Sequence, residues 1–191
     1  GFIKPSNLNF GSIYNNPLWT TISDYVIESE LKLTSRDTEA TYGILFGFKD
    51  HRNYMYFWIS ESENKCKVTR YEDGLKQDIT GYESTGSLLK KGEYNIFQIR
   101  QNFHYDDDGK VENVTLNFVI NGQSVVEKDG FSPLSDMNFG FGVNGDNTKL
   151  TANYFNIRYP CPPETDNSVE NNESSCVGAG TGFALHEDGY I

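Results

Sequence analysis

Three aromatic residues at alternate positions have the arrangement of a ligand platform. Tyr54, Tyr56 and Trp58 alternate with a methionine, a phenylalanine and an isoleucine, so an extended strand projects the two sets to opposite faces. An aromatic row on an open face can stack on the apolar face of a sugar ring while neighbouring polar groups bind its hydroxyls. Because both sets are apolar, the sequence leaves open the alternative that the three rings fill the core.

Two cationic side chains extend this candidate site. His51 lies in the turn before the aromatic row, and loops of this kind line the rims of binding sites. Arg70 follows Val68 by two positions and is expected to face the same groove as Trp58. The predicted ligand-binding residues are therefore Tyr54, Tyr56, Trp58, Arg70 and His51.

Two pairs of carboxylates have a spacing that approaches that of a glycosidase. Glu28 and Glu30, and likewise Glu61 and Glu63, lie two residues apart, and retaining glycosidases use two carboxyl groups about 5–5.5 Å apart. The first pair alternates with apolar residues, which is typical of a solvated strand face. The second pair falls among serines and an asparagine, which is typical of a turn. We therefore expect no catalytic residue in this chain.

An acidic segment that starts at His104 has part of a calcium-loop pattern. Asp106 and Asp108 fall at the third and fifth positions before Gly109, but the first position is a histidine and the twelfth is Thr115. An EF-hand needs an oxygen ligand at the first position and a bidentate glutamate at the twelfth. An acidic hairpin is the better interpretation, and a calcium site of another kind on the loops stays open. No cysteine–histidine cluster has zinc spacing, so we assign no metal ligand and no cofactor.

The three cysteines have different settings. Cys66 lies in an alternating apolar stretch and is predicted to be a packed core thiol. Cys161 and Cys176 bracket a polar segment. A disulfide between them would close a loop of about 15 residues, worth roughly 3 kcal/mol in the loop-entropy estimate. The sequence does not decide whether that bond forms.

Charge and hydropathy exclude several classes of partner. The 191 residues carry 16 basic against 27 acidic side chains, for a net charge of −11. Nucleic acid needs a basic face on its protein partner, so we expect no nucleic-acid binding. No apolar run approaches the roughly 20 residues of a bilayer span, and we expect no membrane insertion.

Short alternating runs separated by turn signals indicate an all-β protein. Six Asn-Gly or Asp-Gly dipeptides punctuate the chain, and 14% of its residues are aromatic. No long stretch has helical periodicity, so we predict a single β-sandwich over residues 1–159. Residues 160–175 carry three prolines and four acids without a base, which predicts a linker. Residues 176–191 turn Gly-rich and apolar again.

Residues 43–54, with the sequence GILFGFKDHRNY, resemble the concanavalin A-like, laminin-G-type jelly-roll families. The order of the hairpin in residues 95–126 and the Phe-Gly-Phe-Gly-Val run and closing strand in residues 139–158 follows the same pattern. The resemblance covers about residues 20–159 and implies a concanavalin A-like jelly-roll β-sandwich. Families of this type bind glycans or proteins. Some members are glycoside hydrolases, whose Glu-x-Asp-x-x-Glu type strand is absent here.

The end of the chain has a second resemblance. Residues 180–183, Gly-Thr-Gly-Phe, and residues 188–191, Asp-Gly-Tyr-Ile, resemble the opening hairpin of bacterial trypsin-like (HtrA-type) serine proteases. In those enzymes a Thr-Asn-x-His segment with the general base follows at once, and this sequence ends before it. His186 lies ahead of the Asp-Gly turn and is not assigned as that base. The resemblance implies an N-terminal accessory part of a protease, or a truncated product.

These observations predict a non-catalytic binding module for a glycan or another extracellular polymer. The two resemblances and the linker cysteines place it outside the cytoplasm, in the periplasm or the extracellular space, with a downstream protease domain as a possible covalent partner. Two alternatives stay open. In the first, the sandwich is a structural or oligomerisation domain without its own ligand. In the second, it is a divergent glycoside hydrolase.

Overall fold

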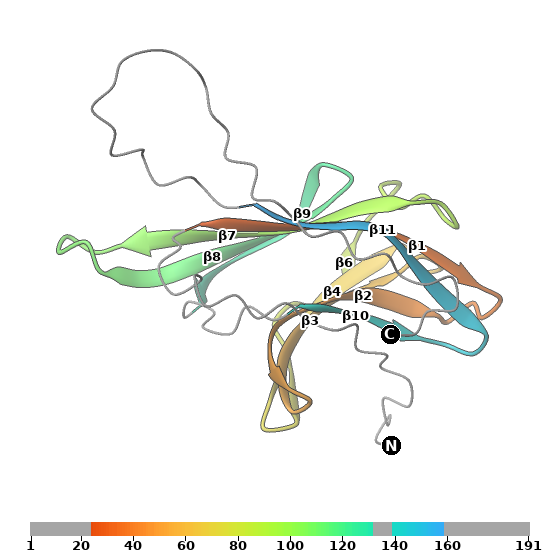
Figure 1. The fold of residues 1–191 in the computed structure, drawn as a ribbon, viewed down its shortest axis with the longest axis horizontal. Helices are drawn as coiled ribbons and strands as arrows, with labels where there is room; N and C mark the ends of the chain where they lie inside the picture. The colour runs from red at the N-terminus through yellow and green to blue at the C-terminus, as the bar shows by residue number, and fades with distance from the viewer. Residues whose placement is uncertain (1–23, 132–138, 159–191) are drawn as a thin grey trace, which may run out of the picture.

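The structure, a computed structural model, describes residues 24–131 and 139–158. In these ranges the chain forms two antiparallel β-sheets that pack face to face (Figure 1). Sheet A has the strand order β11-β1-β7-β8-β9, with bounds β1 Tyr25–Ser35, β7 Asn95–Tyr105, β8 Val111–Ile120, β9 Gln123–Phe131 and β11 Thr148–Arg158. The prediction of an all-β sandwich is confirmed.

Sheet B supplies the second layer. Its strand order is β10-β2-β3-β4-β5, and β6 pairs with β4 beside this path. Within the described residues its strands pair antiparallel. Its strands are β2 Thr41–Asp50, β3 Asn53–Ser60, β4 Lys65–Glu72, β5 Leu75–Asp78, β6 Glu83–Ser84 and β10 Gly140–Asn144.

Alternate residues of both sheets fill the space between the layers. The ring of Phe57 on β3 reaches across to sheet A, where its centroid lies 4.9 Å from that of Phe118 and 6.4 Å from that of Phe97. Each large apolar side chain buried in this way contributes about 1.5–3 kcal/mol to the free energy of unfolding. The largest fully buried aromatic side chains are Tyr25, Tyr42, Phe46, Phe57, Phe97 and Phe118.

Tight turns connect several neighbouring strands. Asn121-Gly122 joins β8 to β9 and Asp73-Gly74 joins β4 to β5, and in both dipeptides each residue has a positive φ between 48° and 84°. This is the geometry of two-residue hairpins, which the dipeptides predicted. The same prediction was wrong for Asp129-Gly130, which lies inside β9. There Gly130, with a φ of 82°, accompanies a shift of register against β8 and forms a bulge.

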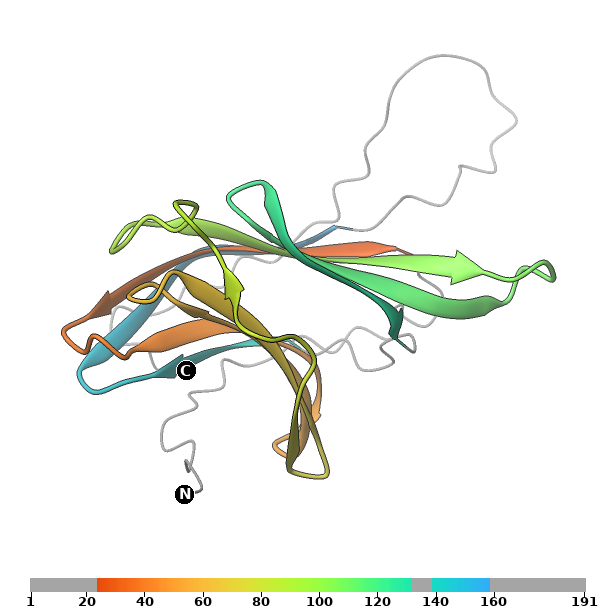
Figure 2. The same cartoon turned by 180° about the vertical axis from the view of Figure 1, so that it is seen from behind.

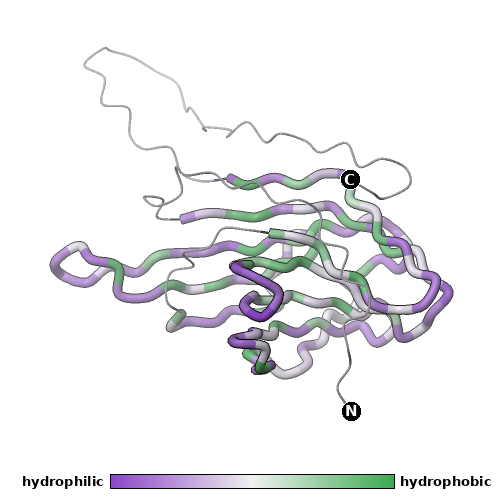
Figure 3. The backbone as a smooth tube through the Cα atoms, turned by 60° about the horizontal axis from the view of Figure 1, so that its bottom comes forward, coloured by the Kyte–Doolittle hydropathy of each residue, from purple (hydrophilic) through white to green (hydrophobic). Residues whose placement is uncertain are grey.

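The two sheets differ in shape. Sheet A is extended, and its β7–β8 hairpin projects beyond the sandwich, whereas the β2–β3 and β4–β5 hairpins of sheet B bend away from sheet A (Figures 1 and 2). The outer face of sheet B is therefore curved. Hydrophobic and hydrophilic residues alternate along the strands, and the tip of the β7–β8 hairpin is hydrophilic (Figure 3). Among the described residues, no helix is long and apolar enough to cross a membrane.

Candidate functional site

The aromatic row of β3 lies on the outer face of sheet B. Met55, Phe57 and Ile59 belong to the core between the sheets, and the chain alternation turns Tyr54, Tyr56 and Trp58 to the opposite side. The alternative in which the three rings fill the core is therefore wrong. Within this row Tyr54 is only 6% exposed, and Tyr56 and Trp58 are partly exposed, so these last two rings keep the surface that a ligand could reach.

Three side chains form a compact group with Trp58. Lys67 lies directly opposite Trp58 in the β3–β4 pairing, and its Nζ is 5.4 Å from the centroid of the Trp58 ring. Tyr82, which follows β5, stands edge-on to Trp58 with ring centroids 5.5 Å apart. Asp78 at the end of β5 approaches from the same face. We call Trp58, Lys67, Asp78 and Tyr82 the outer-face cluster.

Lys67 is the electrostatic centre of this cluster. Its Nζ lies 3.2 Å from Oδ2 of Asp78 and 4.4 Å from the centroid of the Tyr82 ring. The Lys67 side chain is only 4% exposed, whereas that of Asp78 is 48% exposed and Tyr82 is 58% exposed. A buried ammonium needs such partners, because desolvation of an unpaired charge is costly. The ion pair and the cation–π contacts thus hold the two rings and the carboxylate together.

A second pair of rings continues the outer face. Tyr54 on β3 and Tyr71 on β4 are opposite in register and stack with centroids 4.5 Å apart and planes 17° apart. We call them the tyrosine stack. Burial, followed by the proximity of Tyr71, raises the pKa of Tyr54, and burial also raises the pKa of Tyr71. Both rings are therefore neutral hydrogen-bonding groups at physiological pH.

Tyr56 has a structural position within the same face. Its hydroxyl donates a hydrogen bond of 3.1 Å to the carbonyl oxygen of Gly142 on β10. A Cβ atom at residue 142 would lie 2.9 Å from that hydroxyl oxygen, so the glycine makes room for the ring. Burial raises the pKa of Tyr56. This ring ties β3 to the β10 edge and is less available to a ligand than Trp58.

The two predicted cationic residues have different outcomes. Arg70 pairs with Met55, so it lies on the face of β4 opposite to Lys67, and the expectation that it faces the same groove as Trp58 is wrong. Its guanidinium instead donates to Glu72 on the surface. His51 occupies the exposed turn between β2 and β3, as expected. Whether His51 or any other predicted residue binds a ligand stays a prediction.

Four residues of the outer face were missed by the sequence reasoning: Lys67, Tyr71, Asp78 and Tyr82. A signal for Lys67 existed, because the run Lys-Cys-Lys-Val-Thr of residues 65–69 alternates polar and apolar residues. Cys66 is fully buried, which confirms the predicted core thiol and turns residue 67 outward. Asp78 and Tyr82 carry no periodic signal, because they lie at and beyond the end of a short edge strand.

The carboxylate pairs have structural partners. Glu61 is 7% exposed and accepts hydrogen bonds from the Tyr42 hydroxyl at 2.7 Å and from the Gly92 amide at 3.0 Å. Glu30 accepts from the Asn153 amide, and Glu63 pairs with Lys65 at 3.8 Å. Glu28 belongs to a network on sheet A. The expectation of a solvated face for Glu28 is too simple, since its side chain is only 14% exposed.

The acidic hairpin has the local role that the sequence predicted. Oδ1 of Asp106 accepts hydrogen bonds from the backbone amides of Asp108 and Lys110, at 3.1 Å and 2.8 Å. The carboxylate therefore closes the β7–β8 turn. Residues 24–131 and 139–158 contain no group of three or more His, Cys, Asp or Glu side chains placed to hold a metal ion.

Comparison with family models and with curated protein sequences finds no match for this chain. Solved structures do match. Sheep galectin-11, determined in complex with glycerol, has 12% identity and a TM-score of 0.52 over 79% of this chain and 97% of the galectin. Galectin LEC-6 of Caenorhabditis elegans has 11% identity and a TM-score of 0.51 over 80% of this chain and 95% of its own.

A third similar structure is part of a larger chain. The GH43 protein BlXynB of Bacillus licheniformis, as its K247S mutant, has 14% identity and a TM-score of 0.50 over 71% of this chain but only 27% of its own. Together these likenesses define the class: the protein is an all-β, two-sheet antiparallel sandwich of the galectin-like, concanavalin A-like type. The comparisons lend no support to the protease resemblance. Its motif in residues 176–191 and the linker predicted for residues 160–175 lie outside the described residues.

Proposed function

We propose that this domain is a non-catalytic carbohydrate-binding module that binds a glycan on the outer face of sheet B. The observation that carries the proposal is the outer-face cluster. It places the exposed Tyr82 ring and the half-exposed Asp78 carboxylate beside Trp58, on the curved side of the sheet.

The chemistry of the cluster suits a sugar ring. The C–H face of a pyranose or furanose ring is apolar and packs on indole and phenol rings, while its hydroxyls need fixed donors and acceptors. Trp58 and Tyr82 supply the rings, and the half-exposed Asp78 supplies carboxylate oxygens that accept from sugar hydroxyls, while the buried Lys67 ammonium holds that carboxylate in place. The ion pair between Lys67 and Asp78 holds these polar groups in place before a ligand arrives, which lowers the ordering cost of binding.

The charge of the whole chain favours a neutral sugar. Lys67 and Asp78 compensate each other within the cluster, and Lys76, 3.7 Å from the same carboxylate, adds a cation at its rim. An anionic sugar would nevertheless meet the overall negative charge of the chain, −11. In the tyrosine stack Tyr54 is buried, and the partly exposed Tyr71 ring offers a second aromatic surface for a further residue of an oligosaccharide.

The test is a glycan array probed with the complete 191-residue chain, followed by fluorescence titration of the best neutral glycan. Tyr82→Ala removes an exposed ring, and Tyr105→Ala removes a comparably exposed ring from the distant β7–β8 hairpin as the control. We expect Tyr82→Ala to weaken binding about 10-fold, equivalent to about 1.4 kcal/mol, and Tyr105→Ala to leave it unchanged. A glycan bound equally well by Tyr82→Ala, or no binding on the array, would overturn the proposal. Concentration-dependent self-association without glycan binding would then favour an oligomerisation domain.

The setting that we propose for this module is secreted or periplasmic, as an accessory part of a trypsin-like serine protease. Its support is the motif of residues 180–183 and 188–191 alone. In that setting the module would raise the effective concentration of the protease at a glycan-bearing surface. Immunodetection of the native protein tests this: a mass larger than 21.6 kDa by a protease domain supports it, and a mass near 21.6 kDa contradicts it.

A further inference from the structure

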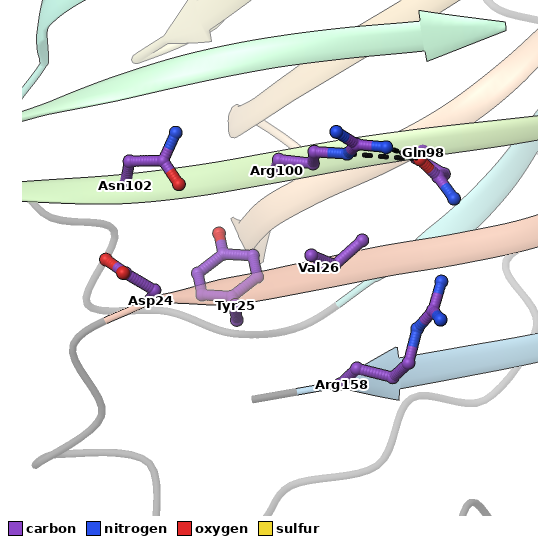
Figure 4. A pocket seen from close by; sticks show the side chains of 7 residues that line it. All are labelled: Asp24, Tyr25, Val26, Gln98, Arg100, Asn102 and Arg158. Atoms are coloured by element: carbon purple, nitrogen blue, oxygen red, sulfur yellow. Dashed lines mark hydrogen bonds between the residues drawn. The ribbon is translucent and has the colours of Figure 1, made fainter. Parts of the chain in front are cut away.

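The outer face of sheet A carries a second concave site, on the side of the sandwich opposite to the outer-face cluster. A pocket of about 420 Å³ lies over the start of β1, the middle of β7 and the end of β11 (Figure 4). Its walls come from Asp24, Tyr25, Val26, Gln98, Arg100, Asn102 and Arg158. Two guanidinium groups therefore meet in one pocket of a strongly acidic chain.

Strand register brings the two arginines together. Val26 on β1 pairs with Arg100 on β7 at one side and with Arg158 on β11 at the other. All three side chains consequently leave the same face of the sheet, with the apolar Val26 between the two cations (Figure 4). Residues 100 and 158 are 58 positions apart in the sequence, and only this register makes them neighbours.

One carboxylate beside the pocket, that of Glu28, orients Arg158 directly and Arg100 through Gln98. Oε2 of Glu28 accepts a hydrogen bond from Nη2 of Arg158 at 2.5 Å and another from the Gln98 amide. Oε1 of Gln98 in turn accepts from Nε and Nη2 of Arg100 at 3.1 Å and 2.6 Å. The other oxygen of Glu28 accepts from the Tyr154 hydroxyl at 3.2 Å. The Glu28 carboxylate is thus fully engaged, and the arginines are fixed before any ligand binds.

The arrangement leaves positive charge unused at the pocket surface. Among the described residues, Arg158 forms its ion pair with Glu28, whereas Arg100 forms no ion pair and contacts the neutral amide of Gln98. Both arginines keep N–H groups beyond these bonds, since each guanidinium has five donors. Fixed guanidinium donors with spare N–H groups are suited to a carboxylate, which they bind through charge-assisted hydrogen bonds.

The remaining wall of the pocket is polar in a different way. Asp24 accepts a hydrogen bond from the Phe103 amide through Oδ1, which fixes its carboxylate at the end of the pocket remote from Arg158 (Figure 4). Asn102 next to it offers both an amide donor and an acceptor. Asp24 would repel a second anionic group but can accept hydrogen bonds from hydroxyl groups. The pocket thus matches a ligand with a carboxylate at one end and hydroxyls at the other.

We propose that this pocket binds the carboxylate of an acidic sugar residue, of the uronate type, with Arg100 and Arg158 on the carboxylate and Asp24 and Asn102 on the hydroxyls. The site is separate from the outer-face cluster and does not depend on the function proposed for it. A chain with both sites would bind two polysaccharides, or two parts of one polysaccharide, through its opposite faces.

Glucuronate, glucose and acetate are the probes that separate the parts of this proposal. Titration of the complete chain at low ionic strength, followed by amide chemical shifts, should show saturable binding of glucuronate that weakens as salt is added. Glucose lacks the carboxylate, and acetate lacks the hydroxyls. Each should therefore bind at least about 10-fold more weakly than glucuronate, because glucose loses the charged hydrogen bonds and acetate loses several neutral ones. Acetate binding as tight as glucuronate binding would overturn the sugar assignment.

Variants locate the site. Arg100→Gln removes the cation that has no carboxylate partner, and Arg36→Gln makes the same change of charge on the exposed β1–β2 turn. We expect Arg100→Gln to weaken glucuronate binding about 10-fold and Arg36→Gln or Tyr82→Ala to leave it unchanged. Equal affinity of Arg100→Gln and the unaltered chain, or no saturable glucuronate binding at all, would overturn the proposal. A loss of glucuronate binding in Tyr82→Ala would assign the binding site to the outer face of sheet B and overturn the proposal.

Discussion

Lys67 and Asp78 form an ion pair whose two members differ strongly in exposure: Nζ and Oδ2 are 3.2 Å apart, yet the lysine side chain is 4% exposed and the aspartate side chain is 48% exposed. The lysine also has the Trp58 and Tyr82 rings as neighbours. Because water reaches Asp78 but hardly reaches Lys67, the lysine depends on the pair far more than the aspartate does.

The first prediction follows from this asymmetry. Asp78→Asn leaves a buried ammonium without its counter-charge, and we expect the free energy of unfolding to fall by about 1–2 kcal/mol, below the full cost of an isolated buried charge because the two rings remain. Lys67→Met, which removes the charge and keeps the apolar stem, should cost less. Urea unfolding of the variants measures both.

The control for that experiment is Lys76→Met. Lys76 pairs with the same aspartate at 3.7 Å, but both side chains are 48% exposed, and exposed pairs contribute less than about 1 kcal/mol. If Asp78→Asn lowers the free energy of unfolding no more than Lys76→Met does, Lys67 does not depend on Asp78.

A second prediction concerns the close approach of β2 and β3. A Cβ atom on Gly43 would lie 1.9 Å from the carbonyl oxygen of Phe57 and 2.9 Å from Cα of Trp58. Both atoms belong to the backbone and cannot rotate away. Gly43→Ala should therefore lower the free energy of unfolding by more than about 3 kcal/mol, or prevent folding, because the strands must separate.

Gly140→Ala provides a matched control on the neighbouring strand. There the nearest atom to an added Cβ is Cδ1 of Leu45 at 3.8 Å, an ordinary contact. Its unfolding midpoint in urea should stay close to that of the unaltered chain. A Gly43→Ala protein as stable as Gly140→Ala would mean that β2 and β3 are less closely spaced at this point.

The thiol of Cys66 gives a third prediction. It is fully buried, and burial, followed by the charge of Glu83, raises its pKa to about 12. A thiol reacts as its thiolate, so at neutral pH Cys66 should react with a disulfide reagent only as fast as the domain opens. The measurement uses a chain with Cys161→Ser and Cys176→Ser, in which Cys66 is the sole thiol. Rapid labelling in native buffer, at the rate seen in denaturant, would exclude the buried position.

The sequence predicted the strands of the candidate site but could not predict their faces. Residues 53–60 alternate two apolar sets, and either set can fill a core, so the choice depends on partners that lie far along the chain. Phe118 and Phe97 on sheet A meet Phe57, and this contact settles the orientation. Once β3 is oriented, its register with β4 turns Lys67 outward and Arg70 to the other face.

Non-local register also explains what was missed altogether. The pocket on sheet A joins residues from three strands, and neither Arg100 nor Arg158 belongs to a recognisable motif. Asp129-Gly130 shows the opposite error, because a dipeptide that favours positive φ marks a turn or a bulge equally well. Local chemistry predicts that the chain bends there, and only strand pairing determines which structure results.

The last prediction concerns tyrosines and alkaline pH. Burial raises the pKa of Tyr25 above its ordinary value of 10.0. Below pH 10 the phenol is neutral in both the folded and the unfolded chain, so its ionisation does not change the free energy of unfolding. Above pH 10 the unfolded chain releases the proton and the folded chain does not, and the free energy of unfolding should fall by about 1.4 kcal/mol per pH unit for each such tyrosine.

Tyr25→Phe isolates this effect. The Tyr25 hydroxyl is buried and has no hydrogen-bond partner in the part of the chain that the structure describes, so the substitution removes an ionisable group without breaking a bond. At neutral pH the variant should be more stable by about 1 kcal/mol, because an unsatisfied buried hydroxyl is lost. Above pH 10 its advantage should grow, since it no longer titrates at this site. Urea unfolding at neutral pH and above pH 10 measures the difference in free energy of unfolding between Tyr25→Phe and the unaltered chain. A difference that stays constant with pH would show that Tyr25 ionises in the folded chain.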